Sequence, residues 1–365
     1  MEDWTKETLL KQWEALSQKS TVPEQSIDID LETVPQTVPS AEALQKIWEE
    51  RRKTVPEEFH VTVELEAGET HEEAVARMYP ETYRLFGQGL ASKKDIEHAI
   101  QTTYRGRLVS KFHKALKTYD MLQPGDVVGV AISGGKDSLL LAKLFQSLVR
   151  YSKVPFEVRF LAMDPGYAPL NRERLLFNLS WLGIPATVYR SDIFQVADEI
   201  AETPCYLCAR MRRGFLYDRA QQLGCNKLAL GHHFNDVIET TLLNVLWSAN
   251  YKNMMPKIVA RNFNNMELIR PLYFVEEQSI IAWRDMAGLK PLDCACVVTQ
   301  HKVDSQRRNI KALIQMLKTL NPNVEKSILR SGENVALDAI LGYTLDGKKH
   351  SFMEHYNQED AWKQF

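Results

Sequence analysis

The sequence predicts an α/β protein whose core is a doubly wound, mostly parallel β-sheet. Two observations support this class. Strand-like apolar runs alternate with helical stretches over residues 127–272. The first run, 127–132, leads through a Gly-rich turn directly into a second apolar stretch at 139–144. Because a helical crossover lets the next strand run in the same direction, this alternation is typical of a parallel sheet with helices on both faces.

The predicted elements follow in a regular order. Strands are expected at 127–133, 158–164, 186–191, 227–233 and 267–272, with helices at 138–151, 171–183, 209–224 and 236–247. Upstream, we expect a strand at 59–65, a helix over 71–90 interrupted near Pro80, and helical structure from 92 to 119. Ligands of such sheets bind at the carboxyl ends of the strands. The turn after residue 132, Asp164 and residues 231–233 should therefore share one crevice.

The turn itself, Ser133-Gly134-Gly135-Lys136-Asp137-Ser138, has the composition of a phosphate-binding loop. Two glycines let backbone N–H groups converge on an anion, and the start of the following helix adds partial positive charge. Lys136 supplies a full positive charge, and Ser133 and Ser138 supply hydroxyls. A Walker loop is excluded, since Val130 stands where its first glycine belongs and Asp137 follows Lys136. The dinucleotide pattern G-x-G-x-x-G is also absent.

A cysteine pair, Cys205 and Cys208, is the second feature with chemical meaning. Both lie at the start of a predicted helix, where two sulfurs can meet one metal and the helix N-terminus favours thiolate. The C-x-x-C spacing alone leaves zinc, dithiol redox chemistry and an iron–sulfur cluster open. Cys294 and Cys296 form a second, closer pair, whereas Cys225 is expected to be a buried core residue.

Charge is distributed unevenly along the 365 residues. Residues 1–100 hold 11 basic and 21 acidic side chains, and the remaining 265 residues hold 34 and 26. A basic body can attract a polyanion, although the charge balance alone favours a solvated surface with no partner. No apolar run is long enough to span a membrane, and the N-terminal residues do not resemble a signal peptide, so we expect a cytoplasmic protein. The sequence is compatible with a homodimer but does not fix the oligomeric state.

Three motifs together resemble one family. The strings S-G-G-K-D-S, C-Y-L-C-A-R-M-R-R-G and L-G-H-H-F-N-D-V-I-E-T, in this order, are similar to the tRNA 2-thiocytidine synthetase branch of the pyrophosphate-loop ATP pyrophosphatases. The resemblance covers about residues 100–345 and implies an adenine nucleotide alpha-hydrolase-like fold. We expect an acidic extension of unknown role at 1–98, the catalytic domain at 99–345 and a C-terminal tail at 346–365.

The resemblance implies a reaction. In that family, ATP adenylates the C2 carbonyl of an anticodon-loop cytidine of tRNA, pyrophosphate leaves, and sulfur then displaces AMP. A [4Fe-4S] cluster held by three cysteines presents the sulfur, which comes from a donor that the sequence does not identify. Here Cys205 and Cys208 would be two ligands and Cys294 the third, with Cys296 a candidate substitute.

The resemblance also implies roles for single residues. Lys136 and the Gly134 and Gly135 amides would bind the β- and γ-phosphates, with Ser133 and Ser138 beside them. Asp137 and Asp236 are candidates to position Mg²⁺, and Asp164 would lie near the adenosine. Arg212, after the cysteine pair, matches a basic position of the family. Only one of two adjacent histidines on a strand can face the nucleotide. The sequence does not say which one does, and His232 is the candidate for this contact.

Two departures from the family pattern stand out. Asn235 replaces a carboxylate, and the second cysteine pair is contracted to C-x-C. Two alternatives stay open beside thiolation. One is a pyrophosphate-loop ligase of the lysidine synthetase kind, which needs no cluster. The other is a non-catalytic ATP- or metal-binding protein whose acidic arm recruits a partner.

Overall fold

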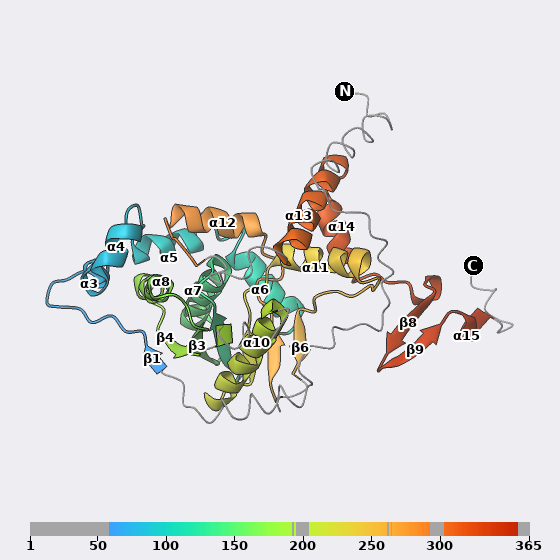
Figure 1. The fold of residues 1–365 in the computed structure, drawn as a ribbon, viewed down its shortest axis with the longest axis horizontal. Helices are drawn as coiled ribbons and strands as arrows, with labels where there is room; N and C mark the ends of the chain where they lie inside the picture. Colours follow the sequence, from blue (N-terminus) through green and yellow to red (C-terminus); the bar gives the residue numbers. More distant parts are fainter. Residues whose placement is uncertain are drawn as a thin grey trace, which may run out of the picture. The chain divides into compact units, whose positions relative to one another are not determined.

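The computed structural model of the chain describes residues 58–191, 193–194, 204–260, 263, 265–292 and 303–356, all within one compact unit (Figure 1). For residues 204–210 and 303–305 it describes the main chain alone. Two predicted positions, Cys294 and Cys296, lie outside the described residues, as does most of the acidic extension. The described helices include none that is long and apolar enough to cross a membrane.

The predicted fold class is confirmed. Among the described residues, seven strands form one sheet in the order β1-β4-β3-β2-β5-β7-β6. The inner strands β4, β3, β2, β5 and β7 pair in parallel, while β1 and β6 pair antiparallel at the two edges. The strand bounds are Glu58–His60 (β1), Val127–Ile132 (β2), Glu157–Asp164 (β3), Ala186–Arg190 (β4), Lys227–Ala229 (β5), Lys257–Val259 (β6) and Glu267–Ile269 (β7).

Helices cover both faces of this sheet. On one face, residues such as Val128 and Val130 of β2 pack in the main core with α7 (Lys136–Tyr151), α8 (Pro169–Trp181) and α12 (Glu277–Met286). On the other face, Ala131 packs against Ala220 of α10 (Pro204–Gln222). Gly129 points to this second face, where an added Cβ would lie 2.9 Å from Leu161 Cδ1. The sheet is therefore doubly wound.

Residues before the first parallel strand belong to the same core. The helices α3 (His71–Met78) and α4 (Pro80–Phe86) pack on α8, separated from each other at Pro80 as expected (Figure 1). Val61, Val75 and Ile96 are buried in the main core. The helix α5 (Lys93–Gln101) runs without a break through residue 98, and α6 (Val109–Thr118) follows. The division of the chain at residue 98 stays a prediction.

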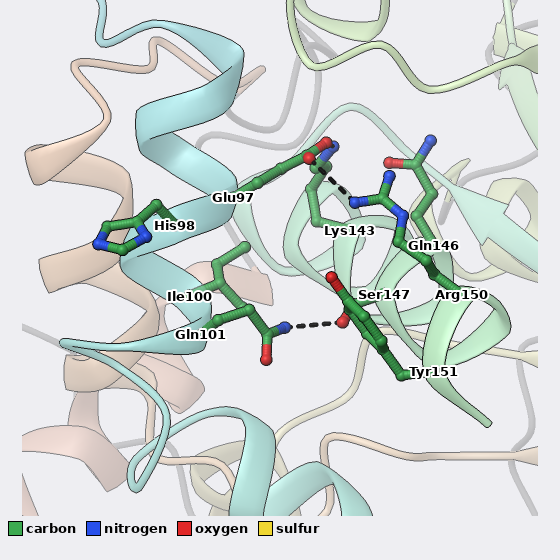
Figure 2. A pocket seen from close by; sticks show the side chains of 9 residues that line it. All are labelled: Glu97, His98, Ile100, Gln101, Lys143, Gln146, Ser147, Arg150 and Tyr151. Atoms are coloured by element: carbon green, nitrogen blue, oxygen red, sulfur yellow. Dashed lines mark hydrogen bonds and ion pairs between the residues drawn. The ribbon is translucent and has the colours of Figure 1, made fainter.

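A buried ion pair fastens α5 to α7. Residues of the two helices line a pocket of about 260 Å³. Figure 2 shows its side chains, with Glu97 pointing toward Lys143 and Arg150. Lys143 Nζ lies 2.7 Å from Glu97 Oε1 and donates to the Leu182 carbonyl at 2.8 Å. Its side chain is 1% exposed. Because a buried ammonium is costly unless its hydrogen bonds are made, the contact with Glu97 ties α5 to α7, and the Leu182 carbonyl after α8 satisfies a second donor of the lysine.

The remaining described elements follow β7. A long helix, α13 (Val303–Leu320), packs on α11 (Phe234–Trp247), and α14 (Val324–Ser331) contacts both. A short 3₁₀ turn, η1 (Leu337–Ala339), precedes the hairpin β8 (Gly342–Leu345) and β9 (Lys348–Ser351), which is followed by α15 (Met353–Tyr356). The hairpin crosses the position where the C-terminal tail was predicted to begin.

Candidate functional site

The phosphate-binding loop connects the end of β2 to the start of α7, as predicted. Its own hydroxyls fix its shape. The Ser133 backbone N–H donates to Ser138 Oγ at 3.2 Å, and Ser138 Oγ–H donates to the Gly135 carbonyl at 2.9 Å. Gly135 is the N-cap residue of α7 and has no capping side chain. The first N–H groups of α7 therefore remain available to an anion, as at other phosphate-binding helix starts.

Gly134 is required for two separate reasons. Its φ is +81°, in the left-handed region that favours glycine. An added Cβ would also lie 2.8 Å from Leu292 Cδ1 and 2.9 Å from Leu175 Cδ1. The Gly134 carbonyl accepts a hydrogen bond from the Leu292 N–H at 2.9 Å. The backbone of the loop is thus pressed against the core, which fixes its path.

The loop lies where the direction of strand addition reverses. From β2, the chain adds β3 and β4 on one side and then crosses to β5 on the other. Such a reversal opens a crevice at the carboxyl ends of the two central strands. Gly231, just after β5, approaches α7 so closely that a Cβ would lie 3.2 Å from the backbone N of Ser138. The predicted meeting of residues 133–138 with residues 231–233 is therefore observed.

Lys136, the charged residue of the loop, is shared between two carboxylates. Its Nζ lies 3.1 Å from Asp137 Oδ2 and 3.1 Å from Glu277 Oε1. Burial opposes the charge, yet the fields of Asp137 and Glu277 raise the pKa of Lys136 overall. The lysine is thus a fixed positive charge at the start of α7, where the loop presents its N–H groups.

His233 lies between the acidic groups of the site. The side chain is 4% exposed, with Nε2 3.7 Å from Asp137 Oδ1 and Nδ1 3.5 Å from Asp236 Oδ2. His233 also caps α11, since the Asp236 N–H donates to its Nδ1 and Asp236 Oδ2 accepts from its backbone N–H. The imidazole therefore separates the two aspartates that were predicted to position Mg²⁺.

The two aspartates differ in what they can still bind. Asp137 Oδ1 is buried and accepts no hydrogen bond, with His233 Nε2 3.7 Å away, so it keeps the capacity to bind a cation. Asp236 already accepts from His233 and lies 3.4 Å from Arg307 Nη1. Burial opposes ionisation of Asp236, but the charge of His233 and its backbone N–H lower the pKa of this carboxyl. Of the two predicted ligands, Asp137 fits a magnesium ion better.

Basic residues of α13 lie beside the acidic residues of the site. Lys311 Nζ lies 3.0 Å from Glu277 Oε2 and 3.8 Å from Glu239 Oε1, and Arg307 Nη1 lies 3.9 Å from Glu239 Oε2. Although burial opposes its ionisation, the hydrogen bond from Lys311 and the charge of Lys136 lower the pKa of Glu277 to about 2. Burial raises the pKa of Glu239 to about 7, against the opposing charge of Lys311.

The other predicted nucleotide contacts lie at neighbouring strand ends. Asp164, at the end of β3, is buried and accepts from the Gly166 and Tyr167 N–H groups at 3.0 and 2.7 Å. His232 follows β5, and burial, helped by the charge of Arg270, lowers its pKa to about 4, so the ring is neutral near pH 7. Its Nδ1 is buried without a hydrogen-bond partner. Their roles toward adenosine stay predictions.

The cysteine motif begins α10. Cys205 and Cys208 are three residues apart in the first turns of this helix. Arg212 follows one turn later and is half-buried. Cys225 is buried beside Ala220 and Leu228, as expected, and burial raises the pKa of its thiol to about 11. Within the described residues, no group of three or more His, Cys, Asp or Glu side chains could hold a metal ion.

Sequence reasoning assigned no role to several residues of this site, among them Glu239, Glu277 and Lys311, and it carried His232 rather than His233 as the candidate. Glu277 and Lys311 lie far along the chain and carry no local motif. His233 did have a signal, since a residue followed three positions later by Asp at a helix start can form a capping pair. The departure at Asn235 also has a structural consequence, because its Oδ1 accepts from the Glu277 N–H at 2.9 Å and so joins the starts of α11 and α12.

Together, the parallel sheet and the glycine loop at its reversal point define a nucleotide-binding α/β domain of the phosphate-loop kind. Comparison with known proteins makes this specific. The model of the PP-loop domain family matches residues 106–293. The tRNA-cytidine(32) 2-sulfurtransferase of Geobacter metallireducens is 37% identical over 66% of this chain and 93% of that protein. The enzyme of the same name from Citrifermentans bemidjiense is 36% identical over 63% of this chain and 90% of its own length.

The chain therefore belongs to the PP-loop family, in the branch of the tRNA-cytidine(32) 2-sulfurtransferases. A solved structure with the same fold is the U34-tRNA thiolase NcsA from Methanococcus maripaludis, described with its [4Fe-4S] cluster. It matches 64% of this chain and 80% of its own, with a TM-score of 0.51 and 22% identity. At this identity the likeness concerns the fold.

Proposed function

We propose that this chain is an ATP-dependent tRNA sulfurtransferase that activates C2 of an anticodon-loop cytidine and replaces its oxygen with sulfur. The observation that carries the proposal is the loop Ser133–Ser138 with Lys136 at the reversal point of the sheet, in a chain that matches curated sulfurtransferases over most of their length. Such a loop binds phosphates, and the relatives supply the class of acceptor.

In the first half of the reaction, the loop binds and polarises the triphosphate. The α7 N–H groups and Lys136 bind its distal oxygens, so negative charge that develops on the leaving pyrophosphate is stabilised where it forms. The carbonyl oxygen of the base attacks the α-phosphorus, the bond to the β-phosphate breaks, and an adenylated base results. Mg²⁺, when bound, neutralises charge on the phosphates, and Asp137, whose Oδ1 accepts no hydrogen bond, is the residue that fits it.

In the second half, sulfur attacks the activated carbon and AMP leaves with the former carbonyl oxygen. We propose Cys205, Cys208 and Cys294 as ligands of a [4Fe-4S] cluster. The three-residue spacing of Cys205 and Cys208 within one helix is compatible with two ligands of one group, and thiolates are the usual ligands of such clusters. When bound, the cluster supplies a site from which sulfur can be transferred. Arg212, one turn further along α10, is proposed to contact the RNA phosphate beside it.

The setting of the reaction follows from its substrate. We propose tRNA as the partner, a small sulfur compound as the donor, and the cytoplasm as the place where both are met. The homodimer stays a prediction that sedimentation of the purified protein can test.

Anaerobic purification followed by in vitro thiolation tests the function. We expect a brown protein that converts ATP to AMP and pyrophosphate and forms 2-thiocytidine in tRNA when sulfide is supplied. The double variant Cys205→Ala/Cys208→Ala should lose the colour and the thiolation. Cys225→Ala is the matched control and should keep both, since this buried thiol lies in a separate core cluster. A colourless, zinc-loaded protein that thiolates tRNA would contradict the cluster.

A further inference from the structure

One carboxylate holds two lysines together in the site. Glu277 Oε1 lies 3.1 Å from Lys136 Nζ, and Glu277 Oε2 lies 3.0 Å from Lys311 Nζ. The two ammonium groups come from α7 and α13, helices distant in the chain, and repel each other unless an anion lies between them. A phosphate group offers the same pairing of oxygens as this carboxylate. We infer that Lys311 is a second phosphate-binding residue, which together with Lys136 holds the β- and γ-phosphates of ATP.

The surroundings of Lys311 favour a binding role over a purely structural ion pair. Its side chain is 47% exposed, so the contact with Glu277 stabilises the fold little. The exposed part of the side chain is free to turn from Glu277 toward an incoming anion. Burial opposes its charge, but the hydrogen bond to Glu277 raises the pKa of Lys311 overall, so the side chain is cationic near neutral pH.

Packing fixes the distance from Lys311 to the loop. Its neighbour Ile310 is fully buried, and Ile314 one turn later is 3% exposed, both in a cluster with Phe234 and Ile238 of α11. The start of α11 carries His233, whose ring contacts Asp137 of the loop. Packing contacts therefore connect α13 to α11, and α11 to the loop at the start of α7. These contacts hold Lys311 on the same side of the loop as Lys136.

This inference rests on the proposed use of ATP and adds a residue to it. When a triphosphate enters the loop, its oxygens replace those of Glu277 as the partners of both ammonium groups. The Glu277 carboxylate then accepts hydrogen bonds from other donors beside it. Because Lys311 meets only the distal phosphates, it should distinguish ATP from AMP. A residue with a structural role alone would affect the two nucleotides equally.

The test is titration calorimetry of the full-length protein with a non-hydrolysable ATP analogue and with AMP. For Lys311→Met we expect the Kd of the analogue to rise about tenfold or more, the usual range for losing one hydrogen bond to a charged group. The Kd of AMP should change less than about twofold, and Lys311→Arg should restore most of the lost affinity. Lys318→Met is the matched control, since Lys318 lies two turns further along α13 and pairs with Glu325 of α14 at 2.8 Å.

An unchanged Kd for the ATP analogue in a folded Lys311→Met protein would overturn the inference, as would an equal loss for AMP. Circular dichroism verifies folding. Should the methionine variant unfold, Lys311→Gln against Lys311→Arg gives the same comparison at a smaller change of shape. These titrations need neither tRNA nor a cluster, so failure of the proposed thiolation and failure of this inference are separate results.

Discussion

At the scale of the residue, the two glycines of the loop differ in how strictly their positions require glycine. Gly134 combines a φ of +81° with contacts that leave no room for a Cβ, whereas Gly135 next to it has a φ of −75° and its nearest Cβ contact at 3.5 Å. Adjacent glycines in one loop therefore have different physical duties. Gly134 fixes the path of the backbone, and Gly135 leaves space beside the N–H groups of α7.

This difference can be measured as stability. We expect Gly134→Ala to lower the free energy of unfolding by about 1–3 kcal/mol, through backbone strain and the contacts with Leu292 and Leu175. Gly135→Ala, the control, should change it by less than about 0.5 kcal/mol. Urea denaturation of both variants decides the matter, and equal effects of the two substitutions would show that the loop path is not fixed as described.

Glu239 predicts a pH dependence of stability. Burial raises its pKa to about 7 in the folded protein, from the ordinary 4.5, so the folded state holds this proton more tightly than the unfolded chain does. Between these two values the folded state binds more protons, and stability falls as pH rises. Glu239→Gln removes this titration. The difference in stability between the variant and the wild type should therefore shift in favour of the variant from pH 5 to pH 8. Denaturation midpoints of both proteins at the two pH values measure this difference. A difference that does not change with pH would contradict the assigned shift.

At the scale of the element, local signals predicted the central strands and the loop well. The runs at 127–132 and 160–163 are apolar because these parts of β2 and β3 are largely buried in the middle of the sheet. The edge strands β1 and β6 are only three residues long, and their antiparallel pairing depends on partners distant in the sequence. The edge strand β6 and the hairpin β8–β9 were not predicted, and the hairpin strands bury little surface. By contrast, β1 overlaps the start of the strand expected at 59–65.

The same limit explains which site residues were found. Residues 133–138 form one contiguous loop, so their chemistry can be read from spacing alone. Glu277 reaches Lys136 because α12 packs on α7, and Lys311 reaches Glu277 because α13 packs on α11. Neither residue belongs to a local motif, and only the fold brings their charges together.

The packing of α13 on α11 gives a prediction at this scale. Ile310 is fully buried against α11, so Ile310→Ala should lower the free energy of unfolding by about 2–4 kcal/mol. It should also weaken binding of the ATP analogue, because Lys311 is the next residue. Leu320→Ala at the far end of the helix, where the side chain is 69% exposed, should leave both unchanged. Denaturation and calorimetry of the two variants check this, and full nucleotide affinity in a destabilised Ile310→Ala protein would separate α13 from the site.

At the scale of the whole molecule, one sheet places the ATP loop, the acidic groups and the basic helix at the carboxyl ends of its strands. The segment before the first parallel strand takes part in this assembly, since Val61, Val75 and Ile96 are buried in the main core. The apolar side chains of this segment therefore serve the fold. Any further role of residues 1–98 would rest on their acidic side chains.

Removal of this segment should be severe. A chain that starts at residue 99 loses β1, α3, α4 and most of α5, together with the partner of the buried Lys143. We expect it to lose cooperative unfolding, because an exposed core and an unpaired buried charge each cost several kcal/mol. Near-ultraviolet circular dichroism during heating checks this. A sharp transition at the temperature of the full chain would show instead that residues 99–365 fold independently.

The central claim is that this chain thiolates a cytidine of tRNA, and mass spectrometry of tRNA nucleosides tests it most directly. Cells that lack the gene should contain no 2-thiocytidine, and the wild-type chain should restore it. Neither Lys136→Ala, which disables the phosphate loop, nor Cys205→Ala should do so, while Cys225→Ala should. A normal level of 2-thiocytidine in cells without the gene would contradict the account.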